Sequence, residues 1–294
     1  MSAPSRVGHP YAGAAVALAT KHQKQDAIAP ALGAVPGLRV VVAQGLDTDA
    51  LGTFTGEIPR PGPPSQTALT KARLGMRALG VARGVASEGS FGPHPELGFV
   101  AVGVELLAFI DDELGIELVE RRICEQTNFA HLETGALDVR TESFLERVGF
   151  PAHALIVRAN RPPGDDAPGP LYKGVSDLAV LRRAIAQCAA ASSDGQARLE
   201  TDMRAHKNPT RMGEIALLAA ALGRRLAQTC VACGAPGFGL VGVERGLRCC
   251  LCARPTELVA CELDGCARCG HSERRPQSDG LGCADPACCE HCNP

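Results

Sequence analysis

Short apolar runs and helically spaced apolar positions follow one another along most of the chain, and this pattern predicts an α/β fold. The apolar run at residues 16–19 predicts a first strand. Apolar positions one turn apart after Gln23 predict a helix, which Pro30 shortens or kinks. Further strands are predicted at residues 38–43, 105–112, 116–120 and 154–157, and further helices at residues 65–76, 141–148, 176–190 and 212–226.

The polar segment that ends the first strand is typical of an anion-binding turn. Thr20, Lys21, His22 and Lys24 lie between the apolar run and the predicted helix. The free N–H groups and the positive dipole at a helix start attract anions, and the two lysines add charge. The alternative is an ordinary strand–helix unit with solvated lysines.

Composition excludes several classes of protein. The chain has 294 residues, of which 45% are hydrophobic, so it can bury a substantial core. No apolar run approaches the roughly 18 residues of a membrane span, and the first ten residues lack a signal-peptide core, so a cytoplasmic protein is expected. A net charge of −2 and an aromatic content of 3% argue against nucleic-acid binding.

Several further polar side chains lie where predicted elements begin or end. Glu57 lies in a loop rich in Gly and Pro, and Lys71 lies in the helix that follows, for which Ser65 is a candidate cap. Glu88 follows a predicted short strand, from which it can reach a shared cleft. The alternatives are a solvated connector, a surface lysine and a turn carboxylate.

Two more polar segments are candidates for the same cleft. Asp111 and Asp112 lie at the turn of the predicted hairpin, where ordinary turn residues are the alternative. Arg204, His206 and Arg211 precede or open a long apolar helix and suit an anionic ligand, although a solvated basic loop is the alternative. A cap at residue 208 followed by proline explains the start of that helix.

The cysteines mark a separate C-terminal unit. Of the 14 cysteines, 12 lie between Cys230 and Cys292, and many form Cys-x2-Cys pairs. In a reducing compartment such pairs favour metal thiolates over disulfides. Cys188 falls on the apolar face of a predicted helix and is expected in the core.

Four Cys-x2-Cys pairs predict two structural zinc sites of four thiolates each. The spacing favours one site from the first two pairs and one from the last two, although a crossed pairing stays open. The first predicted site consists of Cys230, Cys233, Cys249 and Cys252, and Cys250 could replace Cys249. The second consists of Cys266, Cys269, Cys289 and Cys292, and the alternative ligands there are Cys261, Cys283, Cys288, His271 and His291.

The charge of this unit argues for a protein contact. Residues 229–294 contain six Arg, no Lys and eight Asp or Glu, so the basic face needed by a nucleic-acid binder is missing. A structural role or a contact with a protein partner is therefore expected.

The whole chain resembles an uncharacterised bacterial family of proteins with a domain of unknown function. The resemblance rests on Ala-Thr-Lys-His-Gln-Lys at residues 19–24, Gly-Thr-Phe-Thr-Gly-Glu-Ile-Pro-Arg at residues 52–60, and Ala-Ser-Glu-Gly-Ser-Phe-Gly-Pro at residues 86–93. Asp-Met-Arg-Ala-His at residues 202–206 and the terminal Cys-Glu-His-Cys-Asn-Pro also fit. This resemblance implies no established activity.

Residues 14–120 distantly resemble the inosine/xanthosine triphosphate pyrophosphatase superfamily. Members begin with a strand ending in Ala-Thr-x-Asn-x-x-Lys, to which residues 19–24 are similar, and continue with Lys-Ala in a helix and an acidic strand end. The resemblance implies that Lys24 and Lys71 hold phosphates and that Glu88 helps to bind Mg²⁺ or to activate water. The chain departs from the pattern because Lys24 comes one residue early and Gln66 replaces a carboxylate.

The sequence thus predicts a disordered segment 1–11, an α/β domain 12–228 with a mixed sheet like that of the inosine triphosphatases, and a tandem zinc ribbon 229–294. The expected function is a phosphohydrolase, dependent on Mg²⁺ or Mn²⁺, that releases pyrophosphate from a noncanonical nucleoside triphosphate. Lys21, Lys24 and Lys71 would neutralise the phosphates, and Glu57, Asp111 or Asp112 could replace the missing carboxylate. The alternative is a noncatalytic protein that binds a phosphorylated small molecule and contacts a protein partner through its ribbons.

Overall fold

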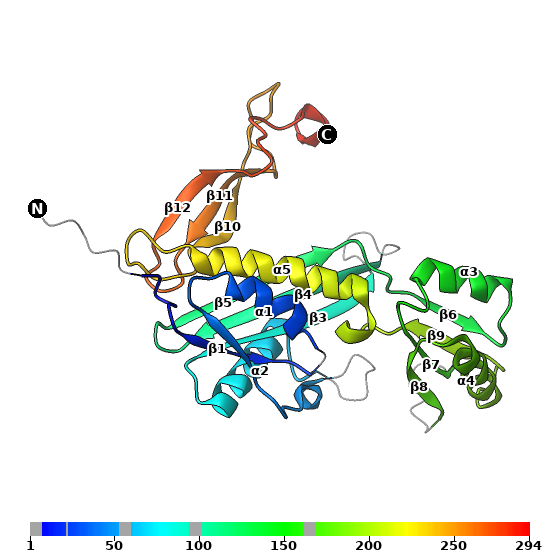
Figure 1. Ribbon diagram of the computed structural model, residues 1–294. Coiled ribbons are helices and arrows are strands. Elements are labelled where there is room, and N and C mark those ends of the chain that lie inside the picture. The colour runs from blue at the N-terminus through cyan, green and yellow to red at the C-terminus, as the bar shows by residue number, and fades with distance from the viewer. Residues whose placement is uncertain (1–7, 22, 53–59, 94–100, 162–168) are drawn as a thin grey trace, which may run out of the picture.

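The computed structural model describes residues 8–21, 23–52, 60–93, 101–161 and 169–294, and their strands form three sheets (Figure 1). A central sheet has the order β2-β1-β3-β4-β5, a sheet in a separate lobe has the order β6-β9-β7-β8, and a third sheet has the order β10-β11-β12. The described chain is therefore a mixed α/β protein, as the apolar pattern predicts.

The central sheet combines parallel and antiparallel strands. β1 pairs in parallel with β2 and β3, whereas β3 pairs antiparallel with β4 and β4 with β5. The predicted hairpin is confirmed, since Asp111 of β4 lies opposite Ile116 of β5. The strands are β1 (Ala15–Ala19), β2 (Arg39–Val42), β3 (Arg83–Pro93), β4 (Ala101–Asp111) and β5 (Ile116–Cys124).

Helices cover both faces of the central sheet (Figure 1). α1 (Gln25–Gly33) and α5 (Pro209–Ala227) pack against each other on one face, where their apolar side chains join Val85 and Leu107 in the main core. α2 (Pro64–Leu79) packs on the other face, against Ala86. Successive residues of β3 thus face different helices.

Of the two helix caps predicted from the sequence, one is confirmed and the other is wrong. Asn208 caps α5, because its side chain accepts a hydrogen bond from the N–H of Arg211, and Pro209 is the first helical residue, as predicted. The cap of α2 is Pro63, and Ser65 lies inside that helix, so the predicted serine cap is wrong. The proline at the first position of α2 needs no N–H partner, which allows this start without a side-chain cap.

A lobe with its own hydrophobic core is inserted between β5 and α5. Its antiparallel sheet packs with α3 and α4 through side chains such as Leu155, Leu181 and Ile185. Cys188 is fully buried in this core, as predicted. The elements of the lobe are β6 (His131–Thr134), α3 (Val139–Val148), β7 (Leu155–Ala159), β8 (Leu171–Val175), α4 (Leu178–Ala190) and β9 (Ala197–Thr201).

The third sheet forms an arm that projects from the central body (Figure 1). It is an antiparallel meander of β10 (Gly239–Arg245), β11 (Val259–Gly265) and β12 (Ser272–Pro276). Three short 3₁₀ turns complete the described elements: η1 (Thr48–Leu51), η2 (Ala205–Lys207) and η3 (Pro286–Cys288).

The segment before β1 belongs partly to the core. The sequence predicts disorder through residue 11, but Tyr11 is fully buried in the main core and its ring lies 5.7 Å from that of Phe109. The apolar body of one aromatic side chain is enough to anchor this segment. None of the helices among the described residues is long and apolar enough to span a membrane.

Candidate functional site

A polar site forms where β3 extends beyond its parallel neighbour β1. Ala19, the last residue of β1, pairs with Ala86 of β3, so the stretch from Ser87 to Gly89 has no β1 residue beside it. The turn before α1 and the first half of α2 lie at this edge. We call the group of Lys24, Arg60, Lys71, Ser87 and Glu88 the edge site.

Lys24 enters the edge site from the face of the sheet that α1 and α5 cover. It occupies the cap position of α1, and its Nζ donates a hydrogen bond of 2.8 Å to Ser87 Oγ. Burial lowers the pKa of Lys24 to about 7, and the charge of Arg211 adds to this effect, while Glu105 and Glu88 oppose it. Lys24 thus holds its proton weakly for a lysine.

Glu88 lies on the opposite face of β3, where two cations reach it. Lys71, from α2, forms an ion pair with Glu88 Oε1. Arg60 Nη2 lies 3.2 Å from Glu88 Oε2 and donates a 2.8 Å hydrogen bond to the carbonyl of Gly89. Both oxygens of the one carboxylate therefore have cationic partners, and positive charge is in excess at the edge site.

A second buried ion pair lies beside the edge site. Arg211 Nε donates to Glu105 Oε1 at 2.6 Å, Arg211 Nη2 to Glu105 Oε2 at 3.3 Å, and each side chain is only 1% exposed. Arg211 comes from the first turn of α5 and Glu105 from β4, opposite Gly89 in register. Arg211 is among the residues predicted from the sequence, but Glu105, which lies in an otherwise apolar run, is not.

The absence of a side chain at Gly89 gives this ion pair the room that it occupies. A Cβ atom there would lie 2.6 Å from Arg211 Nη2 and 2.7 Å from Glu105 Oε1. We expect Gly89→Ala to lower the free energy of unfolding by about 1–3 kcal/mol, because the buried pair has to shift. Urea denaturation measures this change. Gly92→Ala in the same strand is the control, since a Cβ there meets no atom within 4 Å, and equal losses in both variants would contradict the expectation.

Two threonine hydroxyls near the edge site have no hydrogen-bond partner among the residues that the structure describes. The Oγ1 atoms of Thr20, just after β1, and of Thr67, in the first turn of α2, are buried without a hydrogen bond. Thr67 lies one turn before Lys71 on the same side of the helix. A buried hydroxyl without a partner is costly, so these two atoms favour a polar ligand at this edge.

The other predicted phosphate ligands are not gathered at the edge site. Lys21 is exposed and forms an ion pair of 2.8 Å with Asp47. Arg204 Nη2 lies 2.5 Å from Asp202 Oδ2, and His206 lies in η2, before α5. Among the predicted cations that the structure describes, Lys24 and Lys71 enter the edge site and Arg211 lies beside it.

The predicted carboxylates are also widely separated. Glu88 is in the edge site, but Asp111 and Asp112 lie at the opposite end of β3 and β4, where Asp111 pairs with Arg83 at 3.0 Å and accepts hydrogen bonds from the backbone of the hairpin turn. Asp112 forms an exposed ion pair of 2.9 Å with Arg73. Glu57 and His22 lie outside the described residues.

The Cys-x2-Cys pairs of the arm gather in two groups of four. One consists of Cys230, Cys233, Cys266 and Cys269 and the other of Cys249, Cys252, Cys289 and Cys292. We call them the proximal and the distal cluster. The eight predicted ligands are all present, but the pairing is crossed, so the predicted grouping of neighbouring pairs is wrong.

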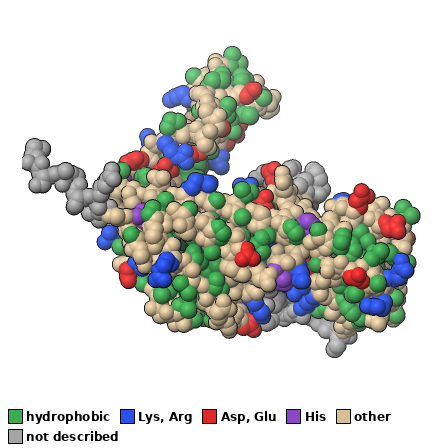
Figure 2. All heavy atoms as spheres, in the orientation of Figure 1, with side chains coloured by type: hydrophobic (Ala, Val, Ile, Leu, Met, Phe, Trp, Pro, Cys, Tyr) green, Lys and Arg blue, Asp and Glu red, His purple; other side chains and the backbone are tan. Residues whose placement is uncertain are grey.

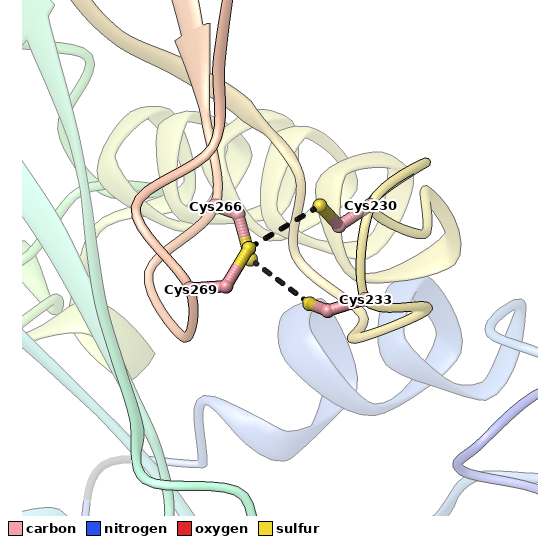
Figure 3. Close-up of side chains that lie close together, drawn as sticks. All are labelled: Cys230, Cys233, Cys266 and Cys269. Carbon is pink, nitrogen blue, oxygen red and sulfur yellow. Dashed lines mark hydrogen bonds between the residues drawn. The ribbon is translucent and has the colours of Figure 1, made fainter.

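The antiparallel course of the arm explains the crossed pairing. The pair at Cys230 precedes β10 and the pair at Cys266 follows β11, and these two ends lie together because β10 and β11 run in opposite directions. The four side chains of the proximal cluster point toward one another beside the end of α5 (Figure 3). The pairs at Cys249 and Cys289 meet at the other end of the arm for the same reason.

Both clusters have the chemistry of a metal site. In the proximal cluster the sulfur atoms of Cys230 and Cys269 are 3.8 Å apart and those of Cys233 and Cys266 are 3.7 Å apart. Burial disfavours the thiolate of Cys266, but N–H groups of Cys269 and Arg268 bond to its sulfur and lower its pKa to about 7. Four thiols around one point, with N–H donors to the sulfur, can hold a metal ion.

The remaining cysteines of the arm stay outside the two clusters. Cys250, a competitor for the first site in the sequence analysis, forms a disulfide with Cys283. Cys261 donates a hydrogen bond to Glu244, and Cys288 is exposed. The imidazole of His271 lies 3.1 Å from Glu273. None of these five residues, nor His291, belongs to either described cluster.

Fold and site together define an α/β protein with an appended arm that carries two groups of four cysteines, each able to hold a metal ion. Residues 71–294 match a family model described as Domain of unknown function (DUF6671), and the chain belongs to this family. No curated protein matches the chain. Membership of an uncharacterised family, expected from the sequence, is thus confirmed, whereas these comparisons give no support to the resemblance to the inosine/xanthosine triphosphate pyrophosphatases.

Proposed function

We propose that the chain is a hydrolase that cleaves a phosphoanhydride bond of a nucleotide, a noncanonical nucleoside triphosphate in the leading case, and releases pyrophosphate. The observation that carries the proposal is that Lys71 and Arg60 meet around the carboxylate of Glu88, on the stretch of β3 that has no β1 residue beside it. Lys24 reaches the neighbouring residue of that stretch, Ser87. Positively charged groups fixed around a transferring phosphoryl group are the main source of catalysis in this class of reaction.

Charge and burial support an anionic substrate. Lys71 and Glu88 are 8% and 4% exposed, so their charges act in a medium less polar than water. On the face that Figure 2 shows, acidic and basic side chains are interspersed, which fits a net charge of −2. Attraction of a phosphate would then come from the few cations of the edge site and not from a broad basic surface.

A resident Mg²⁺ or Mn²⁺ does not fit the described residues of the edge site. Such an ion prefers carboxylate oxygens with free lone pairs, but Glu88 is shared between Lys71 and Arg60, and Glu105 is held by Arg211. Asp111 and Asp112 lie at the far end of the strands. The proposed reaction therefore depends on the cations of the chain itself, with Glu88 orienting Lys71 and Arg60.

Nucleotide turnover and nucleotide binding test the proposal together. The full chain, incubated with a nucleotide panel with and without Mg²⁺ or Mn²⁺, is expected to release pyrophosphate. Lys71→Met should lower kcat/KM by about 100-fold, because one phosphate cation is lost. Arg73→Met is the control, since Arg73 lies on the same helix but pairs with exposed Asp112 and Glu117. Absence of pyrophosphate and phosphate release, with no nucleotide effect on the melting temperature, would refute the proposal.

A second candidate is a noncatalytic protein that binds a phosphorylated small molecule. Its support is that Glu88 forms ion pairs with Lys71 and Arg60, so that the described residues of the edge site offer no free carboxylate to activate water. Glu88→Gln separates the candidates: lost turnover with retained nucleotide binding favours the hydrolase, and nucleotide binding without turnover in the unaltered chain favours the binding protein.

For the arm, we propose that both clusters hold zinc. A tetrahedral site with zinc–sulfur bonds of about 2.3 Å has sulfur–sulfur edges of about 3.8 Å. The distances are 3.6 to 3.9 Å between the sulfur atoms of Cys230 and Cys269, Cys233 and Cys266, Cys249 and Cys292, and Cys252 and Cys289. Closed sites of this kind are structural, and Val231 and Leu251, 75% and 74% exposed at the tips of two cysteine turns, support contact with a protein partner.

A further inference from the structure

The hydrogen bond between Lys24 and Ser87 is a feature of the edge site that phosphate binding does not need. Ser87 shares a face of β3 with Val85, against α1 and α5, whereas Glu88 faces α2. Lys24 Nζ and Ser87 Oγ are 2.8 Å apart, and the two residues are 7% and 6% exposed. A lysine held against a serine hydroxyl, with the solvent largely excluded, is the geometry of a nucleophile and its base.

We propose that Ser87 is a nucleophile and Lys24 its general base, so that cleavage proceeds through a covalent intermediate on Ser87. The phosphoryl substrate of this scheme rests on the function proposed above. The assignment of Lys24 and Ser87 as base and nucleophile depends instead on their positions, Lys24 at the start of α1 and Ser87 just beyond the end of β1.

The proposed reaction has two displacements at phosphorus, and Lys24 carries the proton in each. Neutral Lys24 Nζ takes the proton of Ser87 Oγ, and Oγ forms a bond to phosphorus while the bond from phosphorus to the leaving oxygen breaks. The electron pair of that bond stays on the leaving oxygen, which receives the proton from Lys24. Lys24 then takes a proton from a water molecule, whose oxygen attacks phosphorus, and Ser87 Oγ leaves and recovers its proton.

The surroundings of Lys24 favour the neutral amine that this scheme requires. Burial is the largest cause of its lowered pKa, about 7, and Arg211 from α5 and Lys71 from α2 act in the same direction. Glu105 from β4 and Glu88 from β3 act in the opposite direction. The positive end of the α1 dipole also disfavours a charged amine at this position. Near neutral pH a large share of Lys24 can therefore accept a proton.

Labelling with a fluorophosphonate tests Ser87 as a nucleophile without measuring nucleotide hydrolysis. Diisopropyl fluorophosphate, which reacts with activated serines, is added to the full chain, and intact mass and peptide mapping locate the label. We expect one label per chain, on Ser87, and a labelling rate that rises with pH through about 7 as Lys24 loses its proton. Ser87→Ala should remove the label, and Lys24→Met should slow labelling by about 100-fold. Ser90→Ala, in the same strand, should label normally.

A second variant at Lys24 distinguishes the loss of the general base from the loss of the fold. Lys24→Arg keeps a cation in place but provides no base near neutral pH, so slow labelling in this variant, with a melting temperature near that of the unaltered chain, supports the proposal. An unlabelled Ser87 or equal labelling rates in Lys24→Arg and the unaltered chain would overturn it. If Ser87→Ala still releases pyrophosphate, the assignment of Ser87 as nucleophile is overturned but the proposed hydrolase function stands. If Ser87 is labelled but no nucleotide is turned over, only the proposed hydrolase function is overturned.

Discussion

Replacing Cys230 by serine is expected to lower the melting temperature of the α/β body by about 10 °C or more, because a structural metal site contributes several kcal/mol to folding. Cys230 and Cys266 are buried within the main core, together with Leu118 and Leu226. The proximal cluster is thus part of the packing of the body, and loss of the proposed zinc ion would disturb that packing.

Cys252→Ser is the matched control, because it opens the distal cluster at the far end of the arm. Metal analysis should find two zinc ions per chain in the unaltered protein and one in either variant. The melting temperature of the body, followed by circular dichroism, should stay within about 3 °C of the unaltered value in Cys252→Ser, because no residue of the distal cluster belongs to the main core. Equal shifts in the two variants would show that the proximal cluster is not integral to the body.

Arg211→Met is expected to lower the free energy of unfolding by about 3–5 kcal/mol, because it leaves the carboxylate of Glu105 buried without its cation. Glu105 is fully buried, and both of its oxygens accept from Arg211. Arg211 also donates to the carbonyl of Met203, so the same change leaves a second acceptor without that donor.

Two comparisons isolate the buried charge as the cause. In the double variant Arg211→Met/Glu105→Gln the loss should be smaller than in Arg211→Met alone, because no charge stays in the core. Arg122→Met removes the 2.6 Å ion pair with Glu214, which also joins the central sheet to α5, but Arg122 is 45% exposed, and we expect a loss below about 1 kcal/mol. Urea denaturation measures all three, and a double variant less stable than Arg211→Met would contradict the explanation.

Local features of the fold could be predicted because their causes lie within a few residues. The cap at Asn208, the hairpin that turns after Asp111 and the buried face of α4 around Cys188 each depend on side chains close in sequence. The cysteine pairs are equally local, and the eight cysteines of the two clusters follow from their spacing alone. Ser65 shows the limit of such patterns, since a proline can begin a helix without a polar cap.

Contacts between distant parts of the chain could not be predicted in the same way. Glu105 and Arg211 are 106 positions apart, and the apolar run around Glu105 indicates a buried strand but does not identify the cation that pairs with it. The grouping of the cysteines depends on the direction of β10 and β11, which ligand spacing does not contain. Apolar positions at residues 240–243 and 259–263 could have indicated these two strands, and an antiparallel pair of strands would then have implied the crossed grouping.

The crossed grouping of the cysteines has a consequence for the connectivity of the arm. A metal ion in the proximal cluster closes a loop from Cys230 to Cys269, and an ion in the distal cluster closes a loop from Cys249 to Cys292, so the two loops overlap. A single cut of the backbone between residues 253 and 265 would open both loops at once, whereas a cut between residues 270 and 288 would open only the distal one. Neither metal site can therefore be excised as a contiguous piece of chain that leaves the other uninterrupted.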